Sequence, residues 1–120
     1  MNRKIEMILI IEEENVIGFA LRNYLSKHHV NVHYTGDWDE ARRLLENEKI
    51  KCLISTDTFF CDSDNTKLIA SFVENKNVPL LITTSEPHFE LASKPNVMKV
   101  FRKPYMEEEV NCFLEKLILN

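Results

Sequence analysis

Short continuous apolar runs alternate along the chain with segments in which apolar residues recur at helical spacing. A short apolar run bounded by polar residues is typical of a buried strand. The strands expected on this basis cover residues 5–11, 30–34, 52–56, 78–84 and 97–101. Pro79 is compatible with the fourth strand, because a proline is tolerated near a strand's beginning.

Apolar stripes follow most of these strands and predict amphipathic helices. Asp37 and Glu40 form a capping-box pattern, in which Asp37 caps the second helix and Glu40 reaches back to it. Residues 85–93 can hold only a short helix, because Lys94-Pro95 closes it. The stripes are Ile17, Ala20, Leu21, Tyr24 and Leu25; Ala41, Leu44 and Leu45; Leu68, Ile69, Phe72 and Val73; and Val110, Phe113, Leu114, Leu117 and Ile118.

Five β-α units in 120 residues predict an α/β fold, with an open parallel sheet and helices on both faces. This length suits one domain, which we expect to cover residues 1–120. In such sheets the ligand site lies beyond the carboxyl ends of the strands, where the strand order reverses. The residues of any functional site are therefore expected at that edge of the sheet.

Composition narrows the classes of function. The net charge is -4, with 15 basic and 19 acidic residues and no basic cluster, which argues against direct binding to nucleic acid or anionic lipid. The apolar runs are too short for a membrane span, and the N-terminus lacks a signal-peptide core, so a cytoplasmic location is expected. The three cysteines, Cys52, Cys61 and Cys112, show no metal spacing and fit reduced thiols.

Polar side chains follow the predicted strands at this edge. Glu12 and Glu13 end the first strand and Asp57 ends the third, while Thr84 and Lys103 follow the fourth and fifth. If the first and third strands are neighbours, their ends lie about 5 Å apart, and three carboxylates crowd together. Crowded carboxylates raise one another's pKa or recruit a cation, so the sequence predicts a divalent-metal site beside a nucleophile.

Four segments in order resemble the receiver domain of two-component response regulators, the CheY-like family. They are Ile8–Glu14, Leu53–Asp57, Pro79–Thr84 and Lys103-Pro104. The resemblance implies a doubly wound (βα)5, flavodoxin-like fold with a five-stranded parallel sheet of order 2-1-3-4-5. It also implies a phosphoprotein of bacterial two-component signalling, which changes its binding to an output protein or domain when phosphorylated.

By resemblance, Asp57 accepts a phosphoryl group from a histidine kinase or phosphotransfer protein. Glu13, Asp57 and the backbone carbonyl of Phe59 would bind Mg²⁺, with Glu12 acting largely through water. Thr84 and Lys103 would contact the phosphate, and Lys103-Pro104 would be a cis peptide. The chain would not be an enzyme beyond self-phosphorylation and slow autodephosphorylation.

Several positions depart from the family pattern and leave an alternative open. The family usually has aspartate where Glu12 and Glu13 stand, apolar residues at Ser55 and Thr56, and often an aromatic residue at Val100. These departures favour a pseudo-receiver, which has the same fold and acts by phosphorylation-independent protein contacts. A third hypothesis, flavodoxin-like cofactor binding, is disfavoured because a chain with only two glycines has no phosphate-binding loop.

Overall fold

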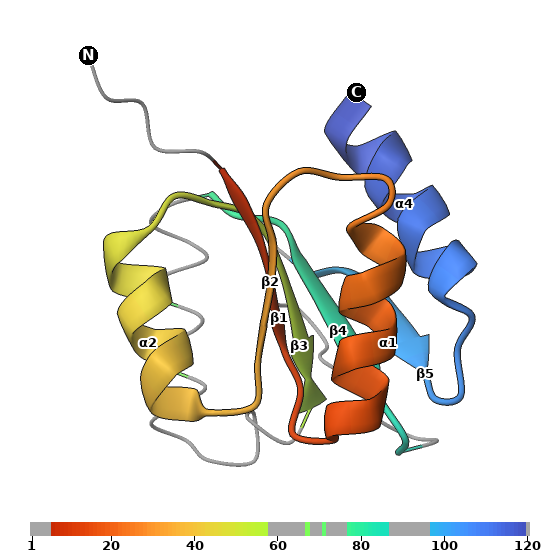
Figure 1. Ribbon diagram of the computed structural model, residues 1–120, viewed down its shortest axis with the longest axis horizontal. Helices are drawn as coiled ribbons and strands as arrows, with labels where there is room; N and C mark the ends of the chain where they lie inside the picture. The colour runs from red at the N-terminus through yellow and green to blue at the C-terminus, as the bar shows by residue number, and fades with distance from the viewer. Residues whose placement is uncertain (1–5, 58–66, 68–70, 72–76, 87–96, 120) are drawn as a thin grey trace.

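The computed structural model describes residues 6–57, 67, 71, 77–86 and 97–119. These residues form a five-stranded parallel sheet in the order β2-β1-β3-β4-β5 (Figure 1). The strands are β1 (Met7–Ile11), β2 (Val32–Thr35), β3 (Ile50–Thr56), β4 (Leu80–Thr84) and β5 (Val97–Arg102). The described helices are α1 (Asn15–Leu25), α2 (Trp38–Asn47) and α4 (Glu107–Leu119).

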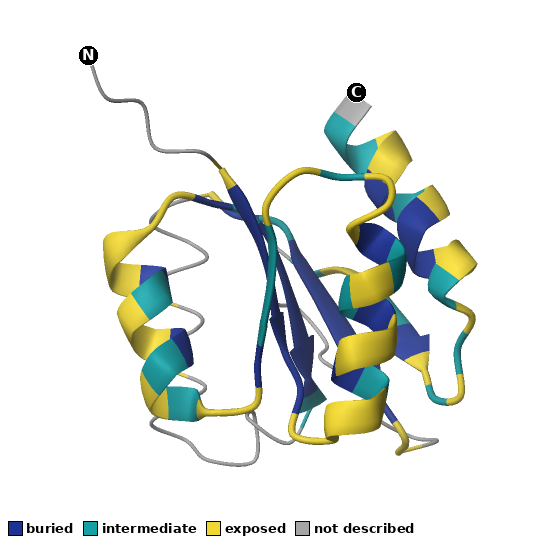
Figure 2. Ribbon diagram, in the orientation of Figure 1, coloured by how far each residue is buried: buried dark blue, intermediate teal, exposed yellow. Residues whose placement is uncertain are grey.

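The sheet separates two hydrophobic cores, because successive side chains of a strand point to opposite faces. Leu9 and Ile11 of β1 pack with residues of α2, whereas Ile8 and Ile10 pack with residues of α1 and α4. Figure 1 shows α2 on one side of the sheet and α1 and α4 on the other, and Figure 2 shows that the strands between them are largely buried. All five residues of β1 are buried, as expected for an interior strand of a sheet covered on both faces. The doubly wound α/β prediction is confirmed.

The predicted strands are all present, with shifted ends. The second begins at Val32 rather than at Val30, which is 82% exposed. Asn31 has a φ of 60°, in the left-handed region, and turns the chain immediately before the strand. The helix expected around Leu68–Val73 lies largely outside the described residues, although residues 67 and 71 are helical. The short helix expected at 85–93 falls mostly outside them.

The predicted capping box is half correct. Asp37 caps α2 and accepts a hydrogen bond from the Asp39 N–H at 3.0 Å. The prediction that Glu40 reaches back to Asp37 was wrong, because its carboxylate lies 2.9 Å from Nε2 of His33. Glu40 therefore binds the imidazole of His33, which lies on β2. A capping-box pattern in the sequence cannot predict this contact, because it describes only residues of the helix itself.

Two further expectations concern the membrane and the thiols. Within the described part of the chain, no helix is long and apolar enough to cross a membrane. Cys52 is a buried free thiol and Cys112 an exposed one. Cys61 lies outside the residues that the structure describes.

Candidate functional site

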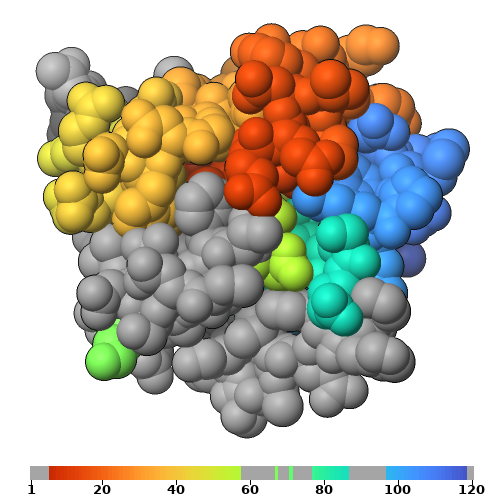
Figure 3. All heavy atoms as spheres, turned by 90° about the horizontal axis from the view of Figure 1, so that it is seen from below, coloured from red at the N-terminus to blue at the C-terminus, as the bar shows by residue number. Residues whose placement is uncertain are grey.

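The carboxyl ends of four strands bring the predicted site residues to one edge of the sheet. Ile11 at the end of β1 pairs with Ser55 of β3, and Thr56 pairs with Thr83 of β4, so these strands finish side by side. Figure 3 looks onto this edge and shows the end of β3, in yellow-green, between α1, in red, and the end of β4, in teal. The sequence prediction of a common edge is therefore confirmed.

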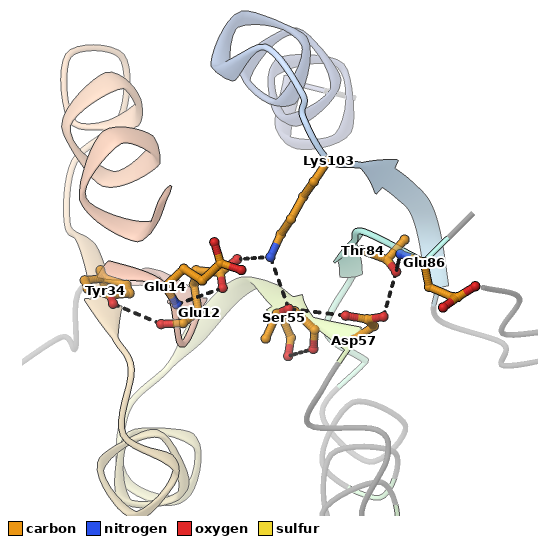
Figure 4. Close-up of polar contacts among 9 residues, drawn as sticks. Glu12, Glu14, Tyr34, Ser55, Asp57, Thr84, Glu86 and Lys103 are labelled. Carbon is orange, nitrogen blue, oxygen red and sulfur yellow. Dashed lines mark hydrogen bonds and ion pairs between the residues drawn. The ribbon is translucent and has the colours of Figure 1, made fainter. Parts of the chain in front are cut away.

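Asp57 and Thr84 form a short side-chain hydrogen bond at this edge. Thr84 Oγ1 donates to Asp57 Oδ2 at 2.6 Å and accepts from the Glu86 N–H at 2.9 Å (Figure 4). Thr84 is buried, whereas Asp57 is only partly buried. Because the hydroxyl oxygen accepts from the Glu86 N–H, its own proton points at the Asp57 carboxylate. That carboxylate remains accessible to solvent.

Lys103 pairs with Glu12 at the same edge. Lys103 Nζ lies 2.8 Å from Glu12 Oε1, and the Glu12 side chain is 3% exposed (Figure 4). Oε1 has no hydrogen bond of regular geometry within the described residues, so the ammonium is the partner that compensates its charge there. Oε2 accepts a hydrogen bond from the Glu14 N–H at 3.1 Å. Both carboxylate oxygens of Glu12 are thus engaged.

Thr56 connects these two pairs. Its hydroxyl oxygen lies 3.5 Å from Lys103 Nζ and 3.4 Å from Asp57 Oδ1. Both distances are at the long end for hydrogen bonds, so these are weak contacts. The buried hydroxyl of Ser55 instead donates to the backbone oxygen of Thr56 at 3.1 Å. Of the two hydroxyls that depart from the family pattern, only that of Thr56 contacts Asp57.

The backbone also fixes Lys103 beside Thr84. The Lys103 N–H donates to the Thr84 backbone oxygen at 2.6 Å, directly after the last residue pair of β4 and β5. The Lys103-Pro104 peptide is cis, as the family resemblance implies. The side chain of Lys103 extends from this point toward Glu12 and the end of β3 (Figure 4).

The expected crowding of three carboxylates is not found. Glu13 is exposed, and no three acidic, histidine or cysteine side chains within the described ranges lie close enough together to hold a metal ion. Lys103, a cation from the chain itself, compensates the charge of Glu12 instead of a metal ion. Phe59 lies outside the described residues, so the complete Mg²⁺ site of Glu12, Glu13, Asp57 and Phe59 stays a prediction.

Two tyrosines, Tyr34 and Tyr105, lie close enough to the acidic residues for their pKa values to be affected. Burial, and then the charge of Glu12, raise the pKa of the Tyr34 phenol. Burial, followed by the charges of Glu12 and Glu107, raises the pKa of Tyr105. Both phenols therefore keep their protons at neutral pH and can act as hydrogen-bond donors. Tyr34 could not be recognised as a neighbour of the site from the sequence, because its contact with Glu12 depends on the pairing of β1 and β2.

Comparison with known proteins identifies the fold. No protein-family model matches the sequence, and no curated protein matches it. Solved structures do match: a response regulator from Thermotoga maritima superposes with a TM-score of 0.79 at 18% identity, covering 96% of this chain and 98% of that one. The fold is that of a response regulator receiver domain.

Two further receiver structures support this identification. The signal receiver domain of an HD domain-containing protein from Pseudomonas fluorescens Pf-5 has a TM-score of 0.77 at 21% identity, covering 98% of this chain and 96% of that one. An orphan response regulator of H. pylori has a TM-score of 0.75 at 15% identity, covering 96% and 98%. At these identities the likeness establishes the receiver fold, and the roles of individual residues depend on the geometry of the site.

Proposed function

We propose that this receiver domain accepts a phosphoryl group on Asp57 from the phosphohistidine of a histidine kinase or phosphotransfer protein. The observation that carries the proposal is the 2.6 Å hydrogen bond from Thr84 to Asp57, at the strand edge where Lys103 also lies. A partly buried carboxylate with a fixed hydroxyl and a nearby ammonium has the components that phosphoryl transfer requires.

The reaction would proceed by attack of an Asp57 oxygen on phosphorus. The bond between phosphorus and the donor imidazole breaks, the electron pair leaves with the imidazole, and an acyl phosphate forms on Asp57. Thr84 can turn its hydroxyl proton toward a phosphoryl oxygen, and Lys103 can supply positive charge to the group as it transfers. Slow hydrolysis by water restores the carboxylate, so the chain would catalyse only its own modification and recovery.

Mg²⁺ binding belongs to this proposal and should be weak. Glu12 already has Lys103 as its counter-ion, which leaves exposed Glu13 and partly buried Asp57 as the carboxylates available to a metal ion. Together with the Phe59 carbonyl they would supply the oxygen ligands that Mg²⁺ prefers. The bound ion would add positive charge beside the phosphoryl oxygens.

The docking place that we propose for the phosphodonor is a hollow next to Lys103. This hollow of about 210 Å³ is lined by residues of α1, including Val16 and Ile17, and by Lys103, Pro104 and Tyr105. Val16 is 83% exposed, so apolar surface lies directly beside the site. We propose that a helix of the kinase or phosphotransfer protein packs here, while phosphorylation alters contacts with an output protein elsewhere.

One observation favours the pseudo-receiver as a second candidate. The Glu12–Lys103 ion pair balances charge without a metal ion and holds the ammonium against Glu12. If Lys103 stays there, Asp57 gains little help from it, and the domain would act through constant protein contacts.

Binding of a phosphoryl mimic separates the two candidates. Beryllofluoride with Mg²⁺ should shift the amide NMR signals of Asp57, Thr84 and Lys103 in the wild type, and Asp57→Asn should abolish these shifts. Asp39→Asn, on the exposed surface of α2, is the matched control and should respond as the wild type does. A wild type whose spectrum does not change would favour the pseudo-receiver.

A further inference from the structure

The hydroxyl of Tyr34, on β2, reaches the segment that connects β1 to α1. The phenol oxygen lies 2.9 Å from the backbone oxygen of Glu12 (Figure 4). It also lies 2.7 Å from Asn15 Oδ1. A phenol has one proton and can donate to only one of these oxygens. The phenol is placed to donate to either oxygen, so its hydroxyl links the Glu12 carbonyl to the Asn15 side chain at the start of α1.

Both glycines of the chain lie against Tyr34. A Cβ on Gly18 would fall 2.2 Å from Tyr34 Cε1, and a Cβ on Gly36 would fall 3.2 Å from the phenol oxygen and 3.1 Å from the Glu12 carbonyl. Gly18 lies inside α1, where glycine is a poor helix former. Phe19 packs edge-on against the phenol ring, with centroids 5.2 Å apart. Glycine at position 18 therefore weakens α1 slightly, but it leaves the space that the ring of Tyr34 occupies.

Tyr34 is one of several contacts that fix Glu12. The Glu12 N–H donates to the Thr35 backbone oxygen at 3.1 Å, and the Glu12 carbonyl accepts from Tyr34. The carboxylate accepts from the Glu14 N–H and pairs with Lys103. Because backbone and side chain are held together, a displaced carbonyl would move the carboxylate that holds the Lys103 ammonium.

We propose that Tyr34 is a positioning residue of the phosphorylation site, which acts through Glu12 to place the ammonium of Lys103. The inference rests on the proposed function for its consequence in phosphoryl transfer. Its structural part, the position of Lys103, can be measured in the unmodified protein. In this proposal β2 contributes a residue, Tyr34, to a site whose other residues lie at the ends of β1, β3, β4 and β5.

Tyr34→Phe tests this role, because it keeps the ring against Gly18 and removes only the hydroxyl. We expect it to displace the ¹⁵N signal of the Lys103 ammonium and to slow phosphorylation of Asp57 by acetyl phosphate about fivefold, the loss of one ordinary hydrogen bond. Tyr24→Phe is the matched control: this tyrosine of α1 packs on His28 and should leave both readouts unchanged. Circular dichroism should show the same folded state in both variants.

Gly18→Ala provides a second variant, which keeps the hydroxyl and pushes the ring away, and it should change both readouts in the same direction. If Tyr34→Phe matches the wild type in the Lys103 signal and in rate, the positioning role is overturned while Asp57 remains the acceptor. If the wild type is not phosphorylated at all, the proposed function fails instead. The Lys103 signal then decides the structural part: displacement in Tyr34→Phe but not in Tyr24→Phe supports it, and no displacement overturns it.

Discussion

The ammonium of Lys103 lies 2.8 Å from the carboxylate of Glu12, and these side chains are 11% and 3% exposed. Removing one partner of a buried ion pair leaves the other charge without compensation in a medium of low polarity, which is strongly destabilising. The pair therefore has two consequences, one for the stability of the fold and one for the chemistry of Asp57.

Glu12→Gln should lower the free energy of unfolding by about 2 to 3 kcal/mol, somewhat below the usual range because Lys103 retains some access to water. Urea denaturation measures the change. Glu6→Gln is the control, because Glu6 pairs with Lys49 at 3.1 Å on the exposed surface. An exposed pair contributes at most about 1 kcal/mol. Equal stability of the two variants would show that the Glu12 pair is energetically no different from a surface pair.

Thr56→Val should slow phosphorylation of Asp57 by acetyl phosphate about two- to threefold, the low end for a hydrogen bond, because both contacts of this hydroxyl are long. Valine keeps the shape of threonine and removes the hydroxyl between Lys103 and Asp57. Thr56→Ser should retain most of the rate. Ser55→Ala is the control, because its hydroxyl contacts the backbone of Thr56 instead. A valine variant as fast as the serine variant would exclude a role for this hydroxyl.

Asn111→Ala should lower the free energy of unfolding by about 1 to 2 kcal/mol, because it leaves a buried hydrogen-bonding site incomplete. Asn111 is buried on α4, and its Oδ1 lies 2.6 Å from Nε2 of His29, just beyond α1. Its Nδ2 donates to Glu115 at 3.0 Å. Asn47→Ala, at an exposed position of α2, should change stability by less than about 0.5 kcal/mol. Thermal or urea unfolding of the two variants provides the comparison.

The thiol of Cys52 should resist alkylation in the folded protein. Burial raises its pKa to about 12 from an ordinary value of 9.0, and the reactive form is the thiolate. At pH 8, iodoacetamide should label exposed Cys112 and leave Cys52 unmodified until the chain unfolds. The unfolded state loses its Cys52 proton first, so this group contributes to a fall in stability as the pH rises from about 9 toward 12. Rapid labelling of Cys52 in native protein would contradict its burial.

Much of the fold follows from local patterns in the sequence. The strands β1, β3 and β4 are mainly apolar and almost fully buried because helices cover both faces of the sheet, so their length and composition predict them without further information. The edge strand β2 was placed too early, because exposed Val30 continues the apolar pattern while Asn31 turns the backbone.

The candidate site could be predicted only in part. The edge that Glu12, Asp57, Thr84 and Lys103 share follows from parallel topology, since all strands finish in the same direction. Parallel topology does not predict which side chains at that edge contact one another. Lys103 pairs with Glu12, and the Tyr34 hydroxyl contacts the Glu12 carbonyl, through distances that depend on strand register and helix packing. Those contacts join residues far apart in the sequence and leave no local pattern.

The most direct test of the account is the intact mass of the protein after incubation with acetyl phosphate and Mg²⁺. We expect the wild type and Asp39→Asn to gain the mass of one phosphoryl group, and Asp57→Asn to gain none, because an amide is a far poorer nucleophile than a carboxylate. A wild type without added mass, or an Asp57→Asn variant modified to the same extent as the wild type, would contradict the assignment of Asp57 as the phosphoryl acceptor.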